Sequence, residues 1–305
     1  MAIVVSGASG ELGTQVAQFL LEQVNPSDLI LLTRSPEKLS WASEKGAQIR
    51  QADFDDTDQL TKALQGGHVF LIISTLSIGR RAQQHSNAIA AAKAAVIPHV
   101  VYTSSMGVQP QTPSISGQEH YATEQTLRAS GMKYTILRNS WYADVIPTLL
   151  MPIGMETGSI VASTGEGSVA PVAKQDCARA AACVLADCEK HENAIYEITG
   201  PQLLTMSDIA RNCSEACGKE ITYVDVSHEE KQAIFDSMGV NREYEEGMMN
   251  EKTNAWASDE MITYEMAIKQ LFFSICSRHV ELITGKAAKS MKQVIEEYRD
   301  VWQAS

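Results

Sequence analysis

The chain has 305 residues, of which 44% are hydrophobic and 20% are charged, and its formal net charge is −12. This length and composition are typical of a globular protein built from one large α/β domain and an appended lobe. The acidic balance argues against a nucleic-acid partner, since phosphate binding requires a basic face, and no apolar run approaches the roughly 20 residues of a membrane span.

The first 140 residues alternate short β-rich segments with amphipathic helical segments. Strands are expected at residues 2–7, 29–33, 47–54, 69–75, 99–105 and 134–140. Helices are expected between them, at residues 12–23, 35–46, 55–64, 83–95 and 119–129. Strands that alternate with helices favour parallel pairing through right-handed crossovers. The predicted fold class is therefore α/β, a Rossmann-like doubly wound parallel sheet.

Beyond about residue 145 the alternation stops. Isolated strands are expected at residues 158–163, 194–199 and 221–226, a helix at 205–219, and a helical, acidic stretch from 228 to 304. We expect residues 1–145 to form the first domain. Residues 146–305 should form a smaller C-terminal α/β lobe that is interleaved with the first domain and not independent of it.

The six cysteines form no Cys-x-x-Cys pair and no cluster with metal-ligand spacing. Free thiols are typical of the reducing cytosol. The N-terminus leads directly into the first strand, without the basic segment and cleavage site of a secretory signal. We therefore expect a cytoplasmic protein with no metal site.

A glycine-rich turn follows the first predicted strand and opens directly into a helix. Glycines let the backbone approach a pyrophosphate closely, and the start of a helix carries partial positive charge. The position within the first strand–helix–strand unit favours dinucleotide binding over an ordinary glycine turn. The residues expected to bind the cofactor here are Gly7, Ala8, Ser9, Gly10, Glu11, Leu12 and Gly13.

The end of the second strand indicates which dinucleotide binds. An acidic residue there usually holds the ribose hydroxyls of NADH, whereas this strand ends in Thr33 and Arg34. A guanidinium can pair with a 2′-phosphate and stack on adenine, and Lys38 follows one turn later. The alternative is a solvated basic pair. The sequence therefore predicts NADPH as the cofactor.

The ends of three further strands should line the crevice where open parallel sheets bind ligands. Asp53 and Phe54 are placed to contact the adenine ring. Each of these residues could instead serve only to cap its strand. The remaining cofactor-binding candidates at the strand ends are Ser74, Thr75, Leu76, Tyr102, Thr103 and Ser104.

Several motifs together resemble a known family. They include GASGELG (7–13), LTRSPEK (32–38), ADFDD (52–56), VVYTSS (100–105), EHYATE (119–124) and ILRNSWYAD (136–144). The chain resembles the NmrA-like group of atypical short-chain dehydrogenase/reductases, nearest to the branch of NADPH:quinone oxidoreductase type 2 and triphenylmethane reductase. The resemblance implies direct hydride transfer from NADPH to a flat conjugated acceptor such as a quinone, bound between the domain and the lobe.

Two alternatives stay open beside this reading. A related branch of the group has lost catalysis and senses NADP(H) as a regulator. A third possibility is a reductase of an enone or imine in specialised metabolism. The expected partner is a small-molecule substrate, and a homodimer is possible.

Typical members of the wider superfamily carry Tyr-x-x-x-Lys on the helix after the fifth strand, where Tyr protonates the substrate. Tyr121 is followed four residues later by Gln125, which carries no charge. Aligning the following Glu instead places His120 at the Lys position and Ser116 at the Tyr position. Thr103 then lies 13 residues before Ser116, the spacing that the family uses.

We therefore expect Thr103, Ser116 and His120 at the catalytic position, with His120 also able to hold the cofactor ribose. Residues 116, 120 and 124 should share one helix face, and Tyr121 should point about 100° away from it. A serine is a poor acid, so the usual ketone-reducing pair is missing. The alternative for His120 is a structural, partly buried histidine.

Asn139, Trp141 and Tyr142 follow the sixth strand at the carboxyl edge of the sheet. Two large aromatic rings at this edge could stack on a flat acceptor. They could equally seal the interface between the domain and the lobe. These three residues are the predicted substrate contacts.

Overall fold

Seven strands form the main sheet, in the order β3-β2-β1-β4-β5-β6-β9, and every neighbouring pair is parallel. The structure is a computed structural model that describes residues 1–245 and 257–304. The strands are β1 (Ile3–Val5), β2 (Leu29–Thr33), β3 (Gln48–Gln51), β4 (Val69–Ile72), β5 (His99–Ser105), β6 (Lys133–Asn139) and β9 (Ala194–Ile198). The predicted α/β, Rossmann-like fold class is confirmed, and the strand order reverses between β1 and β4, where such sheets bind ligands.

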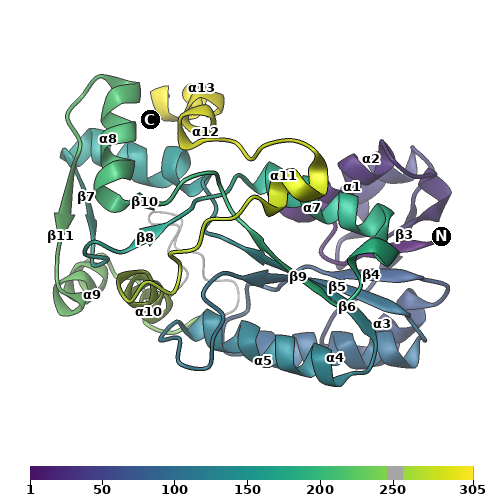
Figure 1. Ribbon diagram of the computed structural model, residues 1–305. Helices are drawn as coiled ribbons and strands as arrows, with labels where there is room; N and C mark the ends of the chain where they lie inside the picture. Colours follow the sequence, from purple (N-terminus) through teal and green to yellow (C-terminus); the bar gives the residue numbers. More distant parts are fainter. Residues whose placement is uncertain (246–256, 305) are drawn as a thin grey trace.

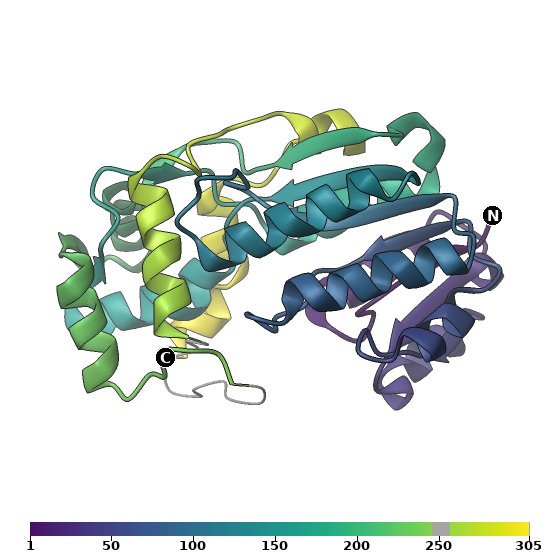
Figure 2. The ribbon, with the colours of Figure 1, turned by 90° about the horizontal axis from the view of Figure 1, so that it is seen from below.

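Helices cover both faces of this sheet (Figure 1). One face carries α1 (Glu11–Leu21), α2 (Ser40–Ser43), α7 (Lys174–Ala186) and α11 (His279–Thr284). The other face carries α3 (Thr57–Leu64), α4 (Arg81–Ala94) and α5 (Ile115–Ala129). Figure 2 looks onto this second layer and shows α4 and α5 side by side.

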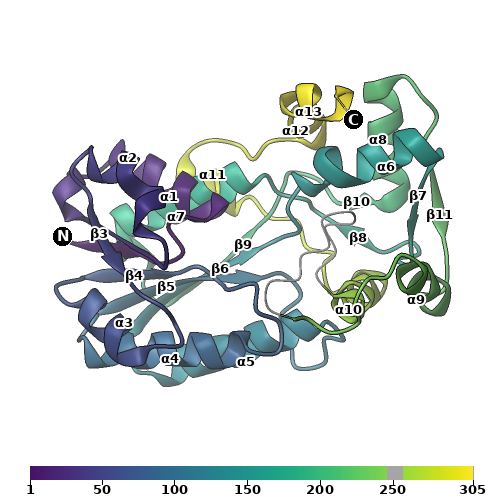
Figure 3. The ribbon, with the colours of Figure 1, turned by 180° about the vertical axis from the view of Figure 1, so that it is seen from behind.

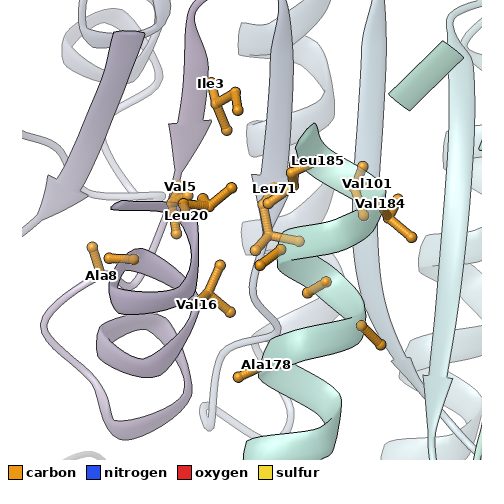
Figure 4. Close-up of a cluster of buried hydrophobic side chains, with 14 of the residues drawn as sticks. Ile3, Val5, Ala8, Val16, Leu20, Leu71, Val101, Ala178, Val184 and Leu185 are labelled. Carbon is orange, nitrogen blue, oxygen red and sulfur yellow. The ribbon is translucent and has the colours of Figure 1, made fainter. Parts of the chain in front are cut away.

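The core on the first face explains why α1 and α7 lie together. Val5 and Leu71, from adjacent strands, pack in one buried cluster with Val16 and Leu20 of α1 (Figure 4). Ala178 of α7 belongs to the same cluster. The sequence of α7 is rich in alanine, so its backbone approaches the sheet and α1 closely. Burying each of the larger aliphatic side chains stabilises the fold by about 1.5–3 kcal/mol.

The C-terminal lobe is built on two small sheets. In one, β7 (Ser159–Ala162) pairs in parallel with β11 (Thr222–Asp225), and in the other β8 (Ser168–Val169) pairs antiparallel with β10 (Leu204–Thr205). Its helices are α6 (Met151–Thr157), α8 (Met206–Cys217), α9 (His228–Ser237), α10 (Ser258–Lys269), α12 (Met291–Glu297) and α13 (Arg299–Gln303). Figure 3 shows α6, α8 and α12 gathered together, with α9 and α10 on the opposite side of the lobe.

Two expectations about secondary structure differ from the fold. The sequence pattern predicts an isolated strand at 194–199, whereas β9 joins the main sheet as an edge strand beside β6. The single helix expected at 35–46 is a 3₁₀ turn, Pro36–Leu39, followed by the short α2. Within the helical stretch expected from 228 to 304, residues 246–256 lie outside the described part of the chain.

None of the helices in residues 1–245 and 257–304 is long and apolar enough to cross a membrane. All six cysteines are free thiols. In the same described ranges, no three His, Cys, Asp or Glu side chains come together in a way that could hold a metal ion.

Candidate functional site

The glycine turn between β1 and α1 needs glycine at two positions for different reasons. Gly7 has a φ of +60°, which L side chains rarely adopt. At Gly13 an added Cβ would lie 2.3 Å from the carbonyl oxygen of Gly7. The first glycine therefore makes the sharp turn, and the last allows α1 to pack directly on it.

The N-cap residue before helix α1 is Gly10, which is exposed and provides no side-chain cap. By contrast, the amide of Gly79, just before α4, donates to Glu119 at 2.9 Å, and the amide of Ser116 in the first turn of α5 donates to Glu260 at 2.9 Å. The first amides of α1 are therefore available to an anion, and the close turn behind them is a cradle that a Cβ would fill. These features fit the diphosphate of a dinucleotide.

Other turn residues are tied to the end of β2. The Ala8 amide donates to the carbonyl of Leu32 at 3.1 Å, and the hydroxyls of Ser9 and Thr33 lie 2.7 Å apart. These bonds hold the turn against the strand end that precedes Arg34. The two predicted parts of the cofactor site are thus one connected structure.

An acidic residue at the start of α1 is neutralised by the first residue of α7. Glu11, in the first turn of α1, forms an ion pair with Lys174. The Lys174 ammonium also lies 5.6 Å from the centre of the Tyr142 ring. Lys174 therefore offsets the negative charge of Glu11 where an anionic cofactor would lie, and it joins the turn to the predicted substrate side.

Arg34 and Lys38 are both exposed, at the end of β2 and in the 3₁₀ turn that follows. Residues 32–35 include no carboxylate. The Asp53 carboxylate accepts a hydrogen bond from the backbone amide of Asp55 at 3.0 Å, so it stabilises the turn in which it lies. The ring of Phe54 lies edge-on to His85, with the ring centres 6.4 Å apart.

The segment after β4 is held by side chains from β5 and α4. The Ser74 amide donates to the Thr103 hydroxyl at 2.9 Å, and the Thr75 amide donates to Nε2 of His85 at 3.1 Å. Leu76 is 52% exposed. Thr103 therefore braces the end of β4 with the same hydroxyl that was expected to act on a substrate.

The pleat of β5 separates the three residues predicted at its end. Tyr102 packs in the cluster between the sheet and α4 and α5, and Ser104 donates to the buried Glu124 of α5 at 2.7 Å. Thr103 lies on the opposite side of the strand, because successive side chains alternate. The structure therefore brings Tyr102 to His120 and keeps Thr103 apart from both.

The predicted face of α5 is present. Ser116, His120 and Glu124 are all buried, whereas Tyr121 is only half-buried. The backbone amide of Ser116 donates to the carboxylate of Glu260 on α10, and its hydroxyl lies 3.1 Å from that of Ser114. Ser116 thus links α5 to the lobe.

His120 belongs to a buried hydrogen-bonded chain. Its Nδ1 lies 2.6 Å from the Tyr102 hydroxyl, which in turn lies 3.2 Å from Nδ1 of His85. Burial lowers the pKa of His120 well below the usual range for a histidine, and the nearby Arg81 charge lowers it further. His120 is therefore a neutral imidazole at physiological pH.

The predicted substrate residues lie on different sides of the seam between domain and lobe. Trp141 packs against two clusters of the lobe, one around Ile146 and one around Phe273. Tyr142 instead packs against the cluster under α1 and α7, and Asn139 donates to its hydroxyl at 3.4 Å. Through Lys174, Tyr142 is connected to Glu11 at the start of α1.

The sequence pattern did not predict that several polar residues belong to the site. Buried Arg81 pairs with Glu119 at 3.2 Å and donates to the carbonyl of Thr75 at 2.7 Å. A spacing of four residues puts Arg81 and His85 on one side of α4, so the helical repeat could have indicated this pair. Glu260 joins from 144 residues away from Ser116, where no local signal exists.

Comparison with known proteins agrees with this geometry. The NAD(P)H-binding family matches residues 7–187. Quinone oxidoreductase 2 of Escherichia coli is 36% identical over 238 residues, 78% of this chain and 82% of that protein. Its crystal structure with NADPH superimposes with a TM-score of 0.87 and 30% identity, covering 97% of this chain and 99% of the other.

Two further relatives extend the match. The Citrobacter sp. triphenylmethane reductase complexed with NADP(H) has a TM-score of 0.84 and 29% identity, covering 97% of this chain and 99% of that one. An NmrA-like family domain-containing oxidoreductase of Aspergillus flavus is 27% identical over 75% of this chain and 76% of its own length. The chain therefore belongs to the NAD(P)H-binding family, as an NADPH-dependent oxidoreductase of the NmrA-like branch that includes quinone oxidoreductase 2.

Proposed function

We propose that the chain reduces a flat, conjugated acceptor such as a quinone by direct hydride transfer from NADPH. The glycine turn and the uncapped start of α1 would hold the diphosphate, and Arg34 with Lys38 would hold the 2′-phosphate. When bound, NADPH supplies the hydride. The protein supplies binding, orientation and the exclusion of water.

The observation that carries this proposal is the face that α5 turns toward β5. At the positions expected for the Tyr–Lys pair of the wider superfamily, this face has Ser116 and His120. The backbone amide of Ser116 is hydrogen-bonded to Glu260 of the lobe, and His120 is neutral. A ketone needs a strong acid to protonate its alkoxide, whereas a quinone spreads the incoming negative charge over its own conjugated system. A site without a phenol–lysine pair therefore suits an acceptor of the second kind.

The aromatic residues after β6 support a flat acceptor. Tyr142 lies next to the glycine turn, through Lys174 and Glu11, and a planar ring can stack on it. Trp141 extends the same edge into the seam with the lobe. The names of two relatives, a quinone oxidoreductase and a triphenylmethane reductase, also point to planar conjugated acceptors.

The test is NADPH oxidation measured with a panel of quinones, triphenylmethane dyes, enones, imines and simple ketones. We expect turnover with quinones and dyes, and none with simple ketones. In single-turnover reactions, deuterium at one of the two C4 positions of NADPH should slow the reaction and deuterium at the other should not. Preferred turnover of an enone or imine would favour a biosynthetic reductase, and tight NADPH binding without any turnover would favour a sensor.

The 2′-phosphate assignment has its own test. Arg34→Ala should raise the Kd of NADPH about 10- to 100-fold, since a charge-assisted hydrogen bond contributes roughly 1.5–3 kcal/mol. The Kd of NADH should stay within about twofold, as this ligand has no 2′-phosphate. Arg211→Ala, an exposed arginine on α8 of the lobe, is the matched control and should change neither value. Equal losses for both cofactors in Arg34→Ala would contradict the assignment.

A further inference from the structure

The chain of hydrogen bonds that ends at His120 has a direction that can be read from its first member. The Thr75 backbone amide can only donate, and it lies 3.1 Å from Nε2 of His85. Nε2 of His85 must therefore accept. Burial, together with the Arg81 charge, lowers the pKa of His85 to about 3, so the ring is neutral. Its one proton is consequently on Nδ1.

The proton on Nδ1 of His85 faces two hydroxyl groups. Thr123 lies at 3.0 Å and Tyr102 at 3.2 Å. The Thr123 hydroxyl donates its own hydrogen to the carbonyl of Glu119 at 2.9 Å, so toward His85 it can only accept. Nothing in this arrangement lets a hydroxyl donate to His85. The Tyr102 oxygen therefore also accepts from it.

The hydrogen of the Tyr102 hydroxyl is then left for His120, whose Nδ1 is 2.6 Å away. Burial raises the pKa of Tyr102, so the phenol keeps this hydrogen. Because Nδ1 of His120 accepts, the proton of its neutral ring must be on Nε2. Among the described residues, no atom accepts a hydrogen bond from Nε2 of His120.

We infer that His85 is a positioning residue, which acts through Tyr102 to hold His120 in its Nε2–H tautomer as a neutral donor for the acceptor oxygen. This inference rests on the proposed function. The hydride adds two electrons and one proton to the acceptor, whose oxygen becomes anionic, and the Nε2–H group stabilises that charge without giving up its proton. Solvent supplies the second proton, which completes the reduced product.

The tautomer is measured directly by the ¹⁵N shifts of the ring nitrogens of His120 in the full-length protein, a readout that needs no turnover. We expect the Nε2–H form alone in the native chain. In His85→Gln the amide can present either its oxygen or its NH₂ group to Tyr102. Both tautomers of His120 should then appear, and kcat should fall about tenfold, with the Kd of NADPH unchanged.

His99→Gln is the matched control. His99 is also buried, lies on the same strand as Tyr102, and has its pKa lowered to about 4 by burial. It bonds to Thr135 and not to the chain that reaches His120. This variant should keep the single tautomer and should keep kcat within about twofold. An equal loss of kcat in His85→Gln and His99→Gln would mean that both histidines act only through stability.

Tyr102→Phe removes the hydroxyl that joins the two histidines and is the second variant, used also if His85→Gln does not fold. This variant alone should allow both tautomers of His120. Adding His85→Gln to it should have no further effect on kcat, because the hydrogen bonds that link His85 to His120 are already broken. Additive losses, or the Nδ1–H form in the native chain, would overturn the inference. Absence of turnover with a correct tautomer would instead count against the proposed function.

Discussion

Acid should destabilise this protein through His85. The group is buried and its pKa falls from 6.5 to about 3 on folding. At a pH above its pKa in the unfolded chain, such a histidine is neutral in both the folded and the unfolded state, so it does not change the free energy of unfolding. Below that value the unfolded chain binds a proton that the folded chain does not, so stability falls with pH down to the folded pKa.

The size of the effect follows from these two pKa values. One proton bound only by the unfolded chain changes the stability by about 1.4 kcal/mol per pH unit. Between the unfolded pKa of 6.5 and pH 5 the loss from His85 is about 2 kcal/mol. This is a large part of the roughly 5–15 kcal/mol that holds a typical domain.

The assay is urea unfolding of the native chain and of His85→Gln, each at pH 7 and at pH 5. The loss of unfolding free energy between the two pH values should be about 2 kcal/mol smaller in the variant, because glutamine does not titrate. The pair of Arg81 and Glu119 and the buried rings of Tyr102 and His120 remain in both chains, so their contributions largely cancel. An identical pH dependence in the two chains would refute the reasoning.

Three further changes test other parts of the structure. Gly13→Ala should abolish NADPH binding measured by calorimetry, because its Cβ would lie 2.3 Å from the Gly7 carbonyl oxygen; normal affinity would contradict the packing. Glu124→Gln should lower the unfolding free energy by about 3 kcal/mol, since buried Glu124 binds Arg138 through two hydrogen bonds of 2.9 and 2.7 Å; a change near zero would argue against this pair. Tyr142→Ala should raise the KM of the acceptor about tenfold while the Kd of NADPH stays constant, whereas Tyr142→Phe should change neither.

The parts of the site that were predicted from the sequence depend on local geometry. The turn from Gly7 to Gly13 is recognisable because a strand, a turn and a helix start follow one another within a few residues. The shared face of Ser116 and His120 follows from the helical repeat alone. Both features could be located without knowing any tertiary contact.

The parts that were not predicted depend on contacts between distant segments. The end of β5 was located correctly, but which side of the strand each residue faces depends on the pleat, and this turns Ser104 toward Glu124. The polarity of the histidine chain needs the Thr75 amide, His85 and His120 together. Sequence spacing could not reveal those distances.

The place of β9 at the edge of the main sheet has a consequence for how the chain must be made. A chain that stopped at residue 145 would lack both β9 and α7, so the five residues of β6 that pair with β9 would form an exposed sheet edge. Arg138 on that strand would also lose Glu197. Exposed edges of this length recruit other chains and aggregate. The main sheet therefore stays incomplete during synthesis until about 50 further residues have emerged and folded against it.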